Sequence, residues 1–358
     1  MMNKVFLTDS EIKENLFPFT LTRSAADIRI GILTIREKWE AYLGQPVSIK
    51  EDGQQVDENV IIVSANIIPS RQFVGSLFDN EGNISDSPDW NAVKVIQFPW
   101  HIFLWNDWAI RHDYELITAN RQSAPLSSTV QTVNGINIFI EPGAKLSHCI
   151  INAEAGPVYI GKNAEIMEGA VIRGPFALCE GAIVKMGTTI YGATTVGPYS
   201  VVGGEIKNSV IFGNSNKAHG GYLGDSVLGE WCNLGAGTSN SNVKNNAGNI
   251  KIYNNILKEY VDSGLQKCGL MMGDYSRAAI NTSFNTGTIT GACVNVFGEG
   301  LMPKFIQSFT WGSKSNDRYE FDKALTDIGN WKKLKKASLT EPEKTRLKLI
   351  FDQNQSSR

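Results

Sequence analysis

The residues best suited to chemistry lie in one polar stretch of the chain, residues 205–242. The stretch contains a histidine, a lysine, a tyrosine and two asparagines: His219, Lys207, Tyr222, Asn233 and Asn242. Imidazole titrates near neutral pH, so His219 can take a proton from an amine that attacks a thioester. Lys207 offers a point charge for a phosphate. The backbone N–H groups of Gly235–Gly237 can stabilise the oxyanion that such a reaction develops.

A repeat of six residues predicts the scaffold that must hold these side chains. From residue 160 to residue 202, every sixth residue is aliphatic: Ile160, Ile166, Ile172, Leu178, Val184, Ile190, Val196 and Val202. Neither the helical period of 3.6 nor the strand period of 2 explains this spacing. It fits a coil of short strands in which three hexads make one turn and the aliphatic residues stack inward. We therefore predict a left-handed parallel β-helix of hexapeptide repeats over residues 133–312.

The repeat is interrupted where the polar residues gather. It resumes in two sets: first Tyr222, Leu228 and Leu234, then Met272, Ala278, Phe284, Thr290, Val296 and Met302. The twenty residues from Val202 to Tyr222 are not a multiple of six, so a register break is expected in 203–221. The polar stretch Asn240–Asn255 predicts a second excursion from the coil. A rigid repeat commonly presents its functional groups at such breaks.

The remaining segments predict two further parts. Residues 1–120 have the pattern of a small α/β domain, with a helix over Thr34–Leu43 and a buried strand over Asn59–Ala65. A linker rich in Ser and Pro follows at 121–132. The last residues, 313–358, are charged and predict a short helical tail with helices at Lys323–Lys336 and Glu341–Asp352.

Composition excludes several classes of partner. The net charge of −2 indicates neither a nucleic-acid surface nor an anionic membrane surface. The longest apolar runs fall short of a membrane span, so no membrane partner is expected. Five cysteines are dispersed without CxxC spacing, which favours reduced thiols and a cytoplasmic location over disulfides or a zinc site.

The stretch Lys207–Asn242 resembles the acetyltransferase domain of the bacterial bifunctional enzymes that acetylate glucosamine 1-phosphate and then uridylylate it. The match runs without a gap, and the β-helix is the scaffold typical of acyltransferases that use acetyl-CoA. The resemblance implies that His219 is the general base. It implies sugar-phosphate contacts from Lys207 and Tyr222, and contacts to the sugar and its amide from Asn233 and Asn242.

The same resemblance implies an acetyl-CoA site at Ala236, Gly237 and Thr238. Two cations of the family are unmatched. Thr189 stands where the family has an arginine one coil earlier, with Arg173 as a substitute to consider, and a later lysine has no equivalent.

The N-terminal domain resembles a divergent branch of the same two-domain enzymes, through the motifs 16–23 (LFPFTLTR), 29–31 (RIG) and 36–39 (REKW). The glycine-rich phosphate loop of ordinary sugar nucleotidyltransferases is missing from the first ten residues. Asn66 stands where that fold presents a magnesium-binding aspartate, and a neutral amide is a weaker ligand. Arg23 and Lys38 are then the candidates for phosphate contacts. The sequence does not identify the residues that would hold Mg²⁺, and Asp9 and Asp107 are two options.

Together these features predict an acyltransferase that N-acetylates an amino-sugar 1-phosphate, glucosamine 1-phosphate first, with acetyl-CoA as cosubstrate. Nucleotidyl transfer to a UDP- or dTDP-sugar, with Mg²⁺, would be a second activity. The resemblance also implies a homotrimer that acts on small molecules. A sugar-nucleotide-binding or regulatory protein and acyl transfer to a sugar hydroxyl remain alternatives. A zinc-dependent carbonic anhydrase needs three histidines, whereas the coil region holds only His148 and His219.

Overall fold

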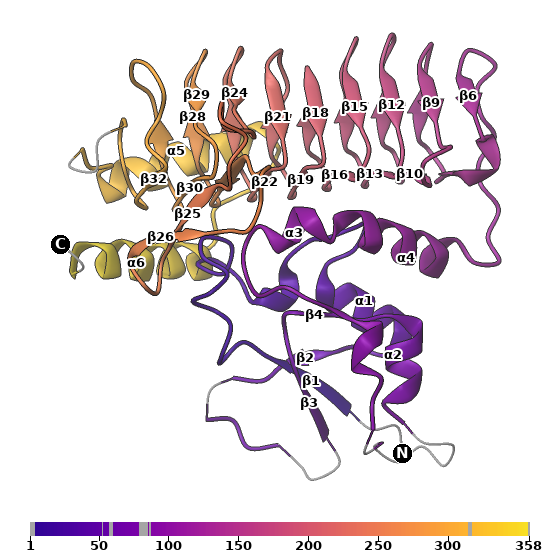
Figure 1. The fold of residues 1–358 in the computed structure, drawn as a ribbon, viewed down its shortest axis with the longest axis horizontal. Coiled ribbons are helices and arrows are strands. Elements are labelled where there is room, and N and C mark those ends of the chain that lie inside the picture. Colours follow the sequence, from indigo (N-terminus) through magenta and orange to yellow (C-terminus); the bar gives the residue numbers. More distant parts are fainter. Residues whose placement is uncertain are drawn as a thin grey trace.

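The computed structural model of the chain describes residues 4–51, 53–56, 60–78, 85, 87–313 and 317–356. Asn59, the first residue of one predicted strand, lies outside the described residues. A long parallel β-helix forms one side of the molecule, and the N-terminal region lies against it (Figure 1). None of the described helices is long and apolar enough to cross a membrane.

The β-helix has three faces of stacked parallel strands. The first face contains β7 (Ile138–Ile140), β10 (Val158–Ile160), β13 (Phe176–Leu178), β16 (Thr194–Val196), β19 (Val210–Ile211), β22 (Val227–Leu228), β27 (Leu270–Met272), β30 (Thr288–Thr290) and β32 (Phe305–Ile306). The second contains β8 (Lys145–Leu146), β11 (Glu165–Ile166), β14 (Ile183–Val184), β17 (Val201–Val202), β20 (Asn216–Lys217), β23 (Asn233–Leu234), β28 (Arg277–Ala278) and β31 (Asn295–Val296). The third contains β6 (Gln131–Val133), β9 (Ile150–Asn152), β12 (Val171–Arg173), β15 (Thr189–Tyr191), β18 (Glu205–Lys207) and β21 (Tyr222–Gly224), followed by the pair β24 (Ser239–Asn240) and β29 (Ser283–Phe284).

The inward column confirms the predicted hexapeptide β-helix. All eight aliphatic residues from Ile160 to Val202 are buried, and so are the six from Met272 to Met302. Tyr222 was assigned wrongly to this column. Leu223 takes the inward position, stacked on Ile206, whereas Tyr222 is half-buried and points outward. Once the coil length changes, the six-residue period alone cannot decide which of two neighbouring apolar residues, here Tyr222 and Leu223, points inward.

The coil length changes where the register break was predicted. Val184 stacks on Val202 after eighteen residues, but Val202 stacks on Lys217 after only fifteen. The second predicted excursion is also present, as an antiparallel hairpin of β25 (Lys251–Asn254) and β26 (Glu259–Asp262). The hairpin leaves the coil between β24 and β27. The polar residues from 219 to 242 therefore lie between the fifteen-residue coil and this inserted hairpin.

The N-terminal region is built on a small parallel sheet in the order β2 (Ser48–Ile49), β1 (Lys4–Thr8) and β3 (Val60–Ser64). The predicted helix is present as α1 (Ile35–Leu43), and Thr34 closes a capping box with Glu37. The predicted buried strand is β3, but it lies at the edge of the sheet and Ile62 is 46% exposed, so its burial was overestimated. This region also contains the 3-10 turns η1 (Ala25–Asp27) and η2 (Trp90–Ala92), the strand pair β4 (Ile67–Ile68) and β5 (Lys94–Val95), and helices α2 (Arg71–Ser76), α3 (His101–Leu104) and α4 (Asn106–Thr118). A further 3-10 turn, η3 (Gly135–Asn137), lies between β6 and β7 of the β-helix.

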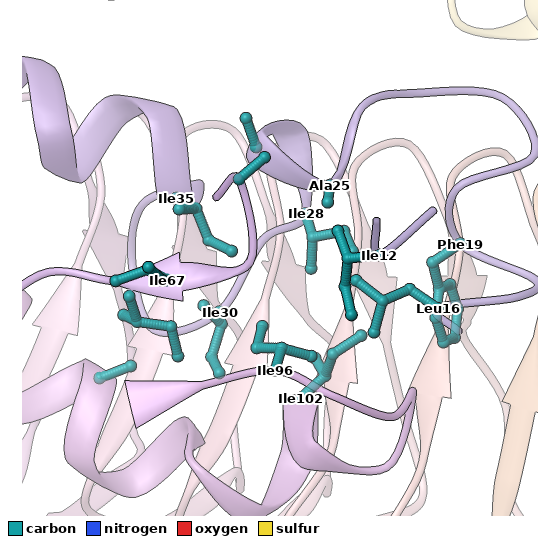
Figure 2. Packing of buried hydrophobic residues seen from close by; sticks show 14 of the residues in the cluster. Ile12, Leu16, Phe19, Ala25, Ile28, Ile30, Ile35, Ile67, Ile96 and Ile102 are labelled. Atoms are coloured by element: carbon teal, nitrogen blue, oxygen red, sulfur yellow. The ribbon is translucent and has the colours of Figure 1, made fainter. Parts of the chain in front are cut away.

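The N-terminal region and the β-helix share one hydrophobic core. Isoleucines of the N-terminal region fill its centre (Figure 2). The same cluster includes Phe212 and Met271 from the first face, and the rings of Phe19 and Phe212 lie 5.4 Å apart. Helix α4 runs along this face (Figure 1). Its residue Ile110 belongs to a buried cluster that also contains Tyr159 of β10. The two parts therefore pack against each other directly through these two clusters.

The predicted C-terminal helices are α5 (Phe321–Leu334) and α6 (Glu341–Ser356). They cover the last coils of the β-helix instead of extending into solvent. Ile328 and Leu347 pack with Phe309 and Cys293 in a separate buried cluster. The ammonium of Lys332 pairs with Glu343, which joins the two helices.

Candidate active site at a corner of the β-helix

The candidate residues lie on the coils that stack at one corner of the β-helix, residues 218–221, which connects β20 on the second face to β21 on the third. The corner is held from both sides by backbone hydrogen bonds. The N–H of Glu205 donates to the carbonyl of Gly221, and the N–H of Gly237 donates to the carbonyl of Gly220 at 3.1 Å. Three successive coils thus stack here and bring distant parts of the polar stretch together.

His219 and Lys207 both present exposed side chains in this region. His219 is on the corner itself, and Lys207 ends β18 on the coil before it. Lys207 lies in register with Gly224 of β21, and Tyr222 lies in register with Glu205 of β18. The imidazole and the ammonium are therefore carried by neighbouring coils and are open to a ligand from solvent.

Tyr222 is oriented by a small polar network. The amide nitrogen of Asn242 donates to the phenol oxygen of Tyr222 at 3.1 Å and also to Asp225. Asp225 is only 4% exposed and accepts a second hydrogen bond from Asn208 at 2.7 Å. Burial raises the pKa of Tyr222 to about 12, and the carboxylate of Asp225 acts in the same direction. The phenol therefore keeps its proton at neutral pH and can donate it to an anionic group.

Asn233 lies one coil further along the second face. It stacks on Asn216 of β20, whose amide nitrogen donates to the Asn233 oxygen at 3.4 Å. Asn216 is three residues before His219, so this contact places Asn233 beside the strand that leads into the corner. Both asparagines are half-buried, so the side chain of Asn233 is partly open to solvent.

The turn 235–238 differs in part from what the sequence predicted. The N–H groups of Gly235 and Gly237 are used within the coil, where they donate to Ala278 and Gly220. This leaves the amide of Ala236, on the exposed tip of the turn, as the donor available to an oxyanion. Gly237 is exposed, but Thr238 is 1% exposed and its hydroxyl donates to the carbonyl of Ala279 at 3.0 Å. Thr238 thus supports the turn, and its side chain is not open to acetyl-CoA.

Two residues of the region were missed as functional candidates, Asp225 and Lys217. Asp225 carries no sequence signal beyond its place in the motif 222–225, because its role depends on a partner seventeen residues away. Lys217 does carry a signal, since it is six residues after the inward Ile211 and is thus a lysine at an aliphatic position. The candidate substitute Arg173 is exposed on β12, with β15 and its Thr189 between it and β18.

Arg23 is not open to a phosphate. Its guanidinium pairs with Asp274 and lies 3.3 Å from a carboxylate oxygen of Glu230, both on the β-helix. The hydroxyl of Thr22 donates to the same Asp274 at 2.5 Å. The side chain of Arg23 is only 10% exposed and stands over the ring of Phe212. Arg23 therefore joins the two parts of the molecule, and its proposed phosphate role is not supported.

Lys38 is also used internally. It is 1% exposed, pairs with Asp113, and donates to the carbonyl of Ile30 at 2.7 Å. Asp113 in turn accepts from the backbone N–H of Ile32 at 2.7 Å. Burial lowers the pKa of Lys38, against the attraction of Asp113. This buried pair holds α1, α4 and the loop between residues 30 and 33, so the proposed phosphate role of Lys38 is not supported either.

At the carboxyl ends of the N-terminal strands, where a metal would be expected, Asp9 and Asn66 make internal hydrogen bonds. Asp9 accepts from the Ser24 hydroxyl and from the N–H of Ala25. Asn66 is 4% exposed and donates to the carbonyl of Ile96 at 2.9 Å. Asp107 pairs with Arg111 on the surface of α4. Across the described part of the chain, no group of three or more His, Cys, Asp or Glu side chains is arranged to hold a metal ion.

Residues 5–84 match the family model of the sugar nucleotidyl transferases. Among curated proteins, the chain is 31% identical over 144 residues to "Bifunctional protein GlmU" of Methanocaldococcus jannaschii, which covers 40% of this chain and 32% of that protein. It is 30% identical over 238 residues to the protein of the same name from Methanococcus maripaludis strain S2, covering 66% of this chain and 53% of that protein.

A third relative is the "Bifunctional sugar-1-phosphate nucleotidylyltransferase/acetyltransferase" of Sulfurisphaera tokodaii. It is 28% identical over 209 residues, which cover 58% of this chain and 47% of that protein. The chain spans between a third and about half of the length of these three relatives. The chain is therefore a divergent protein similar to the bifunctional GlmU enzymes.

Proposed function

We propose that the chain transfers an acetyl group from acetyl-CoA to the amine of an amino-sugar 1-phosphate, with glucosamine 1-phosphate as the first acceptor to test. The observation that carries this proposal is the stacked corner. The exposed His219 lies on this corner, and Lys207, Tyr222, Asn233 and Asn242 are carried by the same coil or by the coils stacked against it. The similarity to proteins named as acetyltransferases supports the same reaction.

The chemistry assigned to His219 is general-base catalysis. Its neutral imidazole takes the proton from the amine as the nitrogen attacks the thioester carbonyl. The new C–N bond forms, the C–S bond breaks, and the sulfur leaves with a proton as the free thiol of CoA. The exposed amide of Ala236 is the donor that we assign to the oxyanion, beside the turn that would hold the acetyl group.

Acceptor binding is assigned to the groups on the third face. The ammonium of Lys207 and the protonated phenol of Tyr222 are the donors for the sugar phosphate. Asn242 fixes Tyr222 through its hydrogen bond and is itself anchored by Asp225. Asn233 is the group that we assign to the sugar and its amide.

We also infer a homotrimer in which neighbouring protomers pack through the third face. The outward residues of that face before the site include several large apolar side chains that are 40–46% exposed: Val133, Ile150, Val171 and Tyr191. An exposed apolar row on a rigid scaffold is typical of an interface, and here it continues directly into β18 and β21. Light scattering at micromolar concentration should give three times the chain mass. A stable monomer would contradict this inference.

The proposed reaction is tested by following thiol release from acetyl-CoA with four acceptors: glucosamine 1-phosphate, galactosamine 1-phosphate, glucosamine and N-acetylglucosamine 1-phosphate. Turnover should be fastest with a phosphorylated amine. Turnover with N-acetylglucosamine 1-phosphate, which has no free amine, would instead indicate transfer to a hydroxyl. Lack of turnover with all four would refute the proposal.

Nucleotidyl transfer is a second candidate function, favoured by the family model over residues 5–84. We propose that it is weak or absent, because Arg23, Lys38, Asp9 and Asn66 are committed to internal contacts. Catalysis of phosphoryl transfer depends on freely presented cations and a metal. Pyrophosphate release should stay at background with UTP, dTTP or GTP and a sugar 1-phosphate, with or without Mg²⁺. Rapid Mg²⁺-dependent release would show that another set of residues does this chemistry.

A further inference from the structure

One inward position of the β-helix is occupied by a lysine. The inward residues of the second face, taken in order, are Leu146, Ile166, Val184, Val202, Lys217, Leu234, Ala278 and Val296. Seven of the eight are aliphatic, and the lysine stands in the middle of the column. Lys217 is 1% exposed, so its side chain lies inside the coil.

The ammonium of Lys217 is directed at the corner that carries His219. It donates to the carbonyl of His219, to the carbonyl of Gly203 at 3.1 Å and to the carbonyl of Gly220 at 3.4 Å. The Gly220 carbonyl also accepts from Gly237, on the turn that includes Ala236. Lys217 thus connects three neighbouring coils from inside the β-helix. It bonds directly to the corner at Gly203 and to the corner 218–221, and through Gly220 it is linked to the turn 235–238.

Packing alone does not account for this lysine. Val202 and Leu234, its neighbours in the column, fill the same position with aliphatic side chains. A buried ammonium loses its hydration, a cost that its hydrogen bonds must offset. Burial lowers the pKa of Lys217 to about 8, so at neutral pH most of it is protonated and can donate to all three carbonyls.

We propose that Lys217 is a positioning residue for acetyl transfer, which fixes the 218–221 corner from inside the β-helix so that His219 faces the acceptor. This inference rests on the proposed function of the corner. Lys217 does not contact the ligand. It sets the backbone from which the imidazole projects, and through Gly220 it also sets the turn that carries the oxyanion donor.

The substitution Lys217→Met tests the proposal, because methionine keeps an unbranched side chain and removes the charge. Leu234→Met, one coil further in the same column, is the matched control for altered packing. Lys217→Arg retains a cationic donor and serves as the rescue variant. All three are compared with the wild-type chain by thermal unfolding, by light scattering and by hydrogen exchange of peptides spanning residues 218–224.

In Lys217→Met, exchange in 218–224 should accelerate while other coils keep their protection, and the Leu234→Met control should show no such change. The kcat for acetyl transfer should fall by about 10- to 100-fold, as expected for a misplaced catalytic group. The KM for acetyl-CoA should change less than about twofold, and Lys217→Arg should recover part of kcat.

The exchange experiment reports on the corner whether or not the chain transfers acetyl groups, so it separates this inference from the proposed function. Unchanged exchange in Lys217→Met would overturn the anchoring of the corner, even in an inactive protein. Faster exchange with an unchanged kcat would overturn the positioning role. If Lys217→Met fails to fold, the Lys217→Arg variant provides the test. A folded Lys217→Arg variant with wild-type exchange in 218–224 but no measurable acetyl transfer would refute the proposal.

Discussion

At the corner of the β-helix, Lys207 and His219 keep their side chains exposed, while Tyr222 and Asn242 are held by neighbours that leave them facing outward. In the N-terminal region, Arg23 and Lys38 are turned inward and paired with buried carboxylates. Residues 5–84 match the family model of the sugar nucleotidyl transferases, and the chain as a whole is similar to proteins named as bifunctional GlmU enzymes. The difference favours the β-helix corner over the N-terminal region as the candidate ligand site, because the charges of the N-terminal region hold the fold together.

Among the substitutions that test this difference between the two regions, loss of the His219 imidazole should have the largest effect, a fall in kcat for acetyl transfer. His219→Asn removes the general base and should lower kcat for acetyl transfer by about 10²- to 10⁴-fold. Stability should not change, since the side chain is exposed. His148→Asn, an exposed histidine on an earlier corner, is the matched control and should keep wild-type turnover. Thiol release gives the rates, and wild-type activity in His219→Asn would refute the mechanism.

The buried pair of Lys38 and Asp113 should show the opposite behaviour, a loss of stability without loss of chemistry. Lys38→Met leaves a buried carboxylate without its cation and should cost about 3–5 kcal/mol in the free energy of unfolding. The folded fraction should keep its kcat for acetyl transfer. Chemical denaturation measures the loss, and Lys162→Met on an exposed corner is the control. Unchanged stability would mean that Lys38 is kept for a ligand.

Lys207→Ala should weaken binding of the phosphorylated acceptor. One lost charge-assisted hydrogen bond is worth about 1.5–3 kcal/mol, so the KM for glucosamine 1-phosphate should rise by roughly 10-fold or more. The KM for acetyl-CoA should stay the same, and Lys162→Ala should change neither. Steady-state kinetics with both substrates varied makes the measurement. Equal effects on both substrates would indicate a structural lysine.

The smallest effect is expected from the support of Tyr222. Asn242→Ala removes the hydrogen bond to the phenol, which is worth about 0.5–1.5 kcal/mol. The KM for the acceptor should rise by a few-fold, and the double variant with Tyr222→Phe should show no further rise from this bond. A double-mutant cycle on KM tests the coupling. Additive effects would show that Asn242 acts independently of Tyr222.

The scaffold was predictable because its signal is periodic and local. Aliphatic residues six apart identify the coil from Ile160 to Val202, and the break in that period indicates the region of the candidate site. The period could not place Tyr222 and Leu223 correctly, because coils of fifteen to seventeen residues shift the inward position without leaving a mark in composition. Lys207 and His219 were predicted as site residues from residue type and spacing, and both are exposed.

Residues whose roles depend on distant partners were not predictable. Arg23 meets Asp274 across about 250 residues, and Lys38 meets Asp113 across 75. A sequence shows both cations as free charges, although folding uses each of them internally. The burial of the Thr238 side chain was not predictable for a similar reason. Its hydroxyl donates to the carbonyl of Ala279, forty-one residues later. Residue type and spacing indicate the chemistry that a side chain can perform. Long-range contacts decide whether that side chain is exposed to a ligand or used inside the fold.

The core shared by the N-terminal region and the β-helix has a consequence for dissection of the chain. Phe212, Met271 and Ile289 are buried against N-terminal isoleucines, so a fragment limited to residues 133–312 would present this apolar face to water. Such a fragment should aggregate, and the intact chain should melt in a single calorimetric transition that includes both parts. Any assignment of separate activities must therefore come from point substitutions in the full chain, because truncation removes a structural support together with the residues it is meant to test.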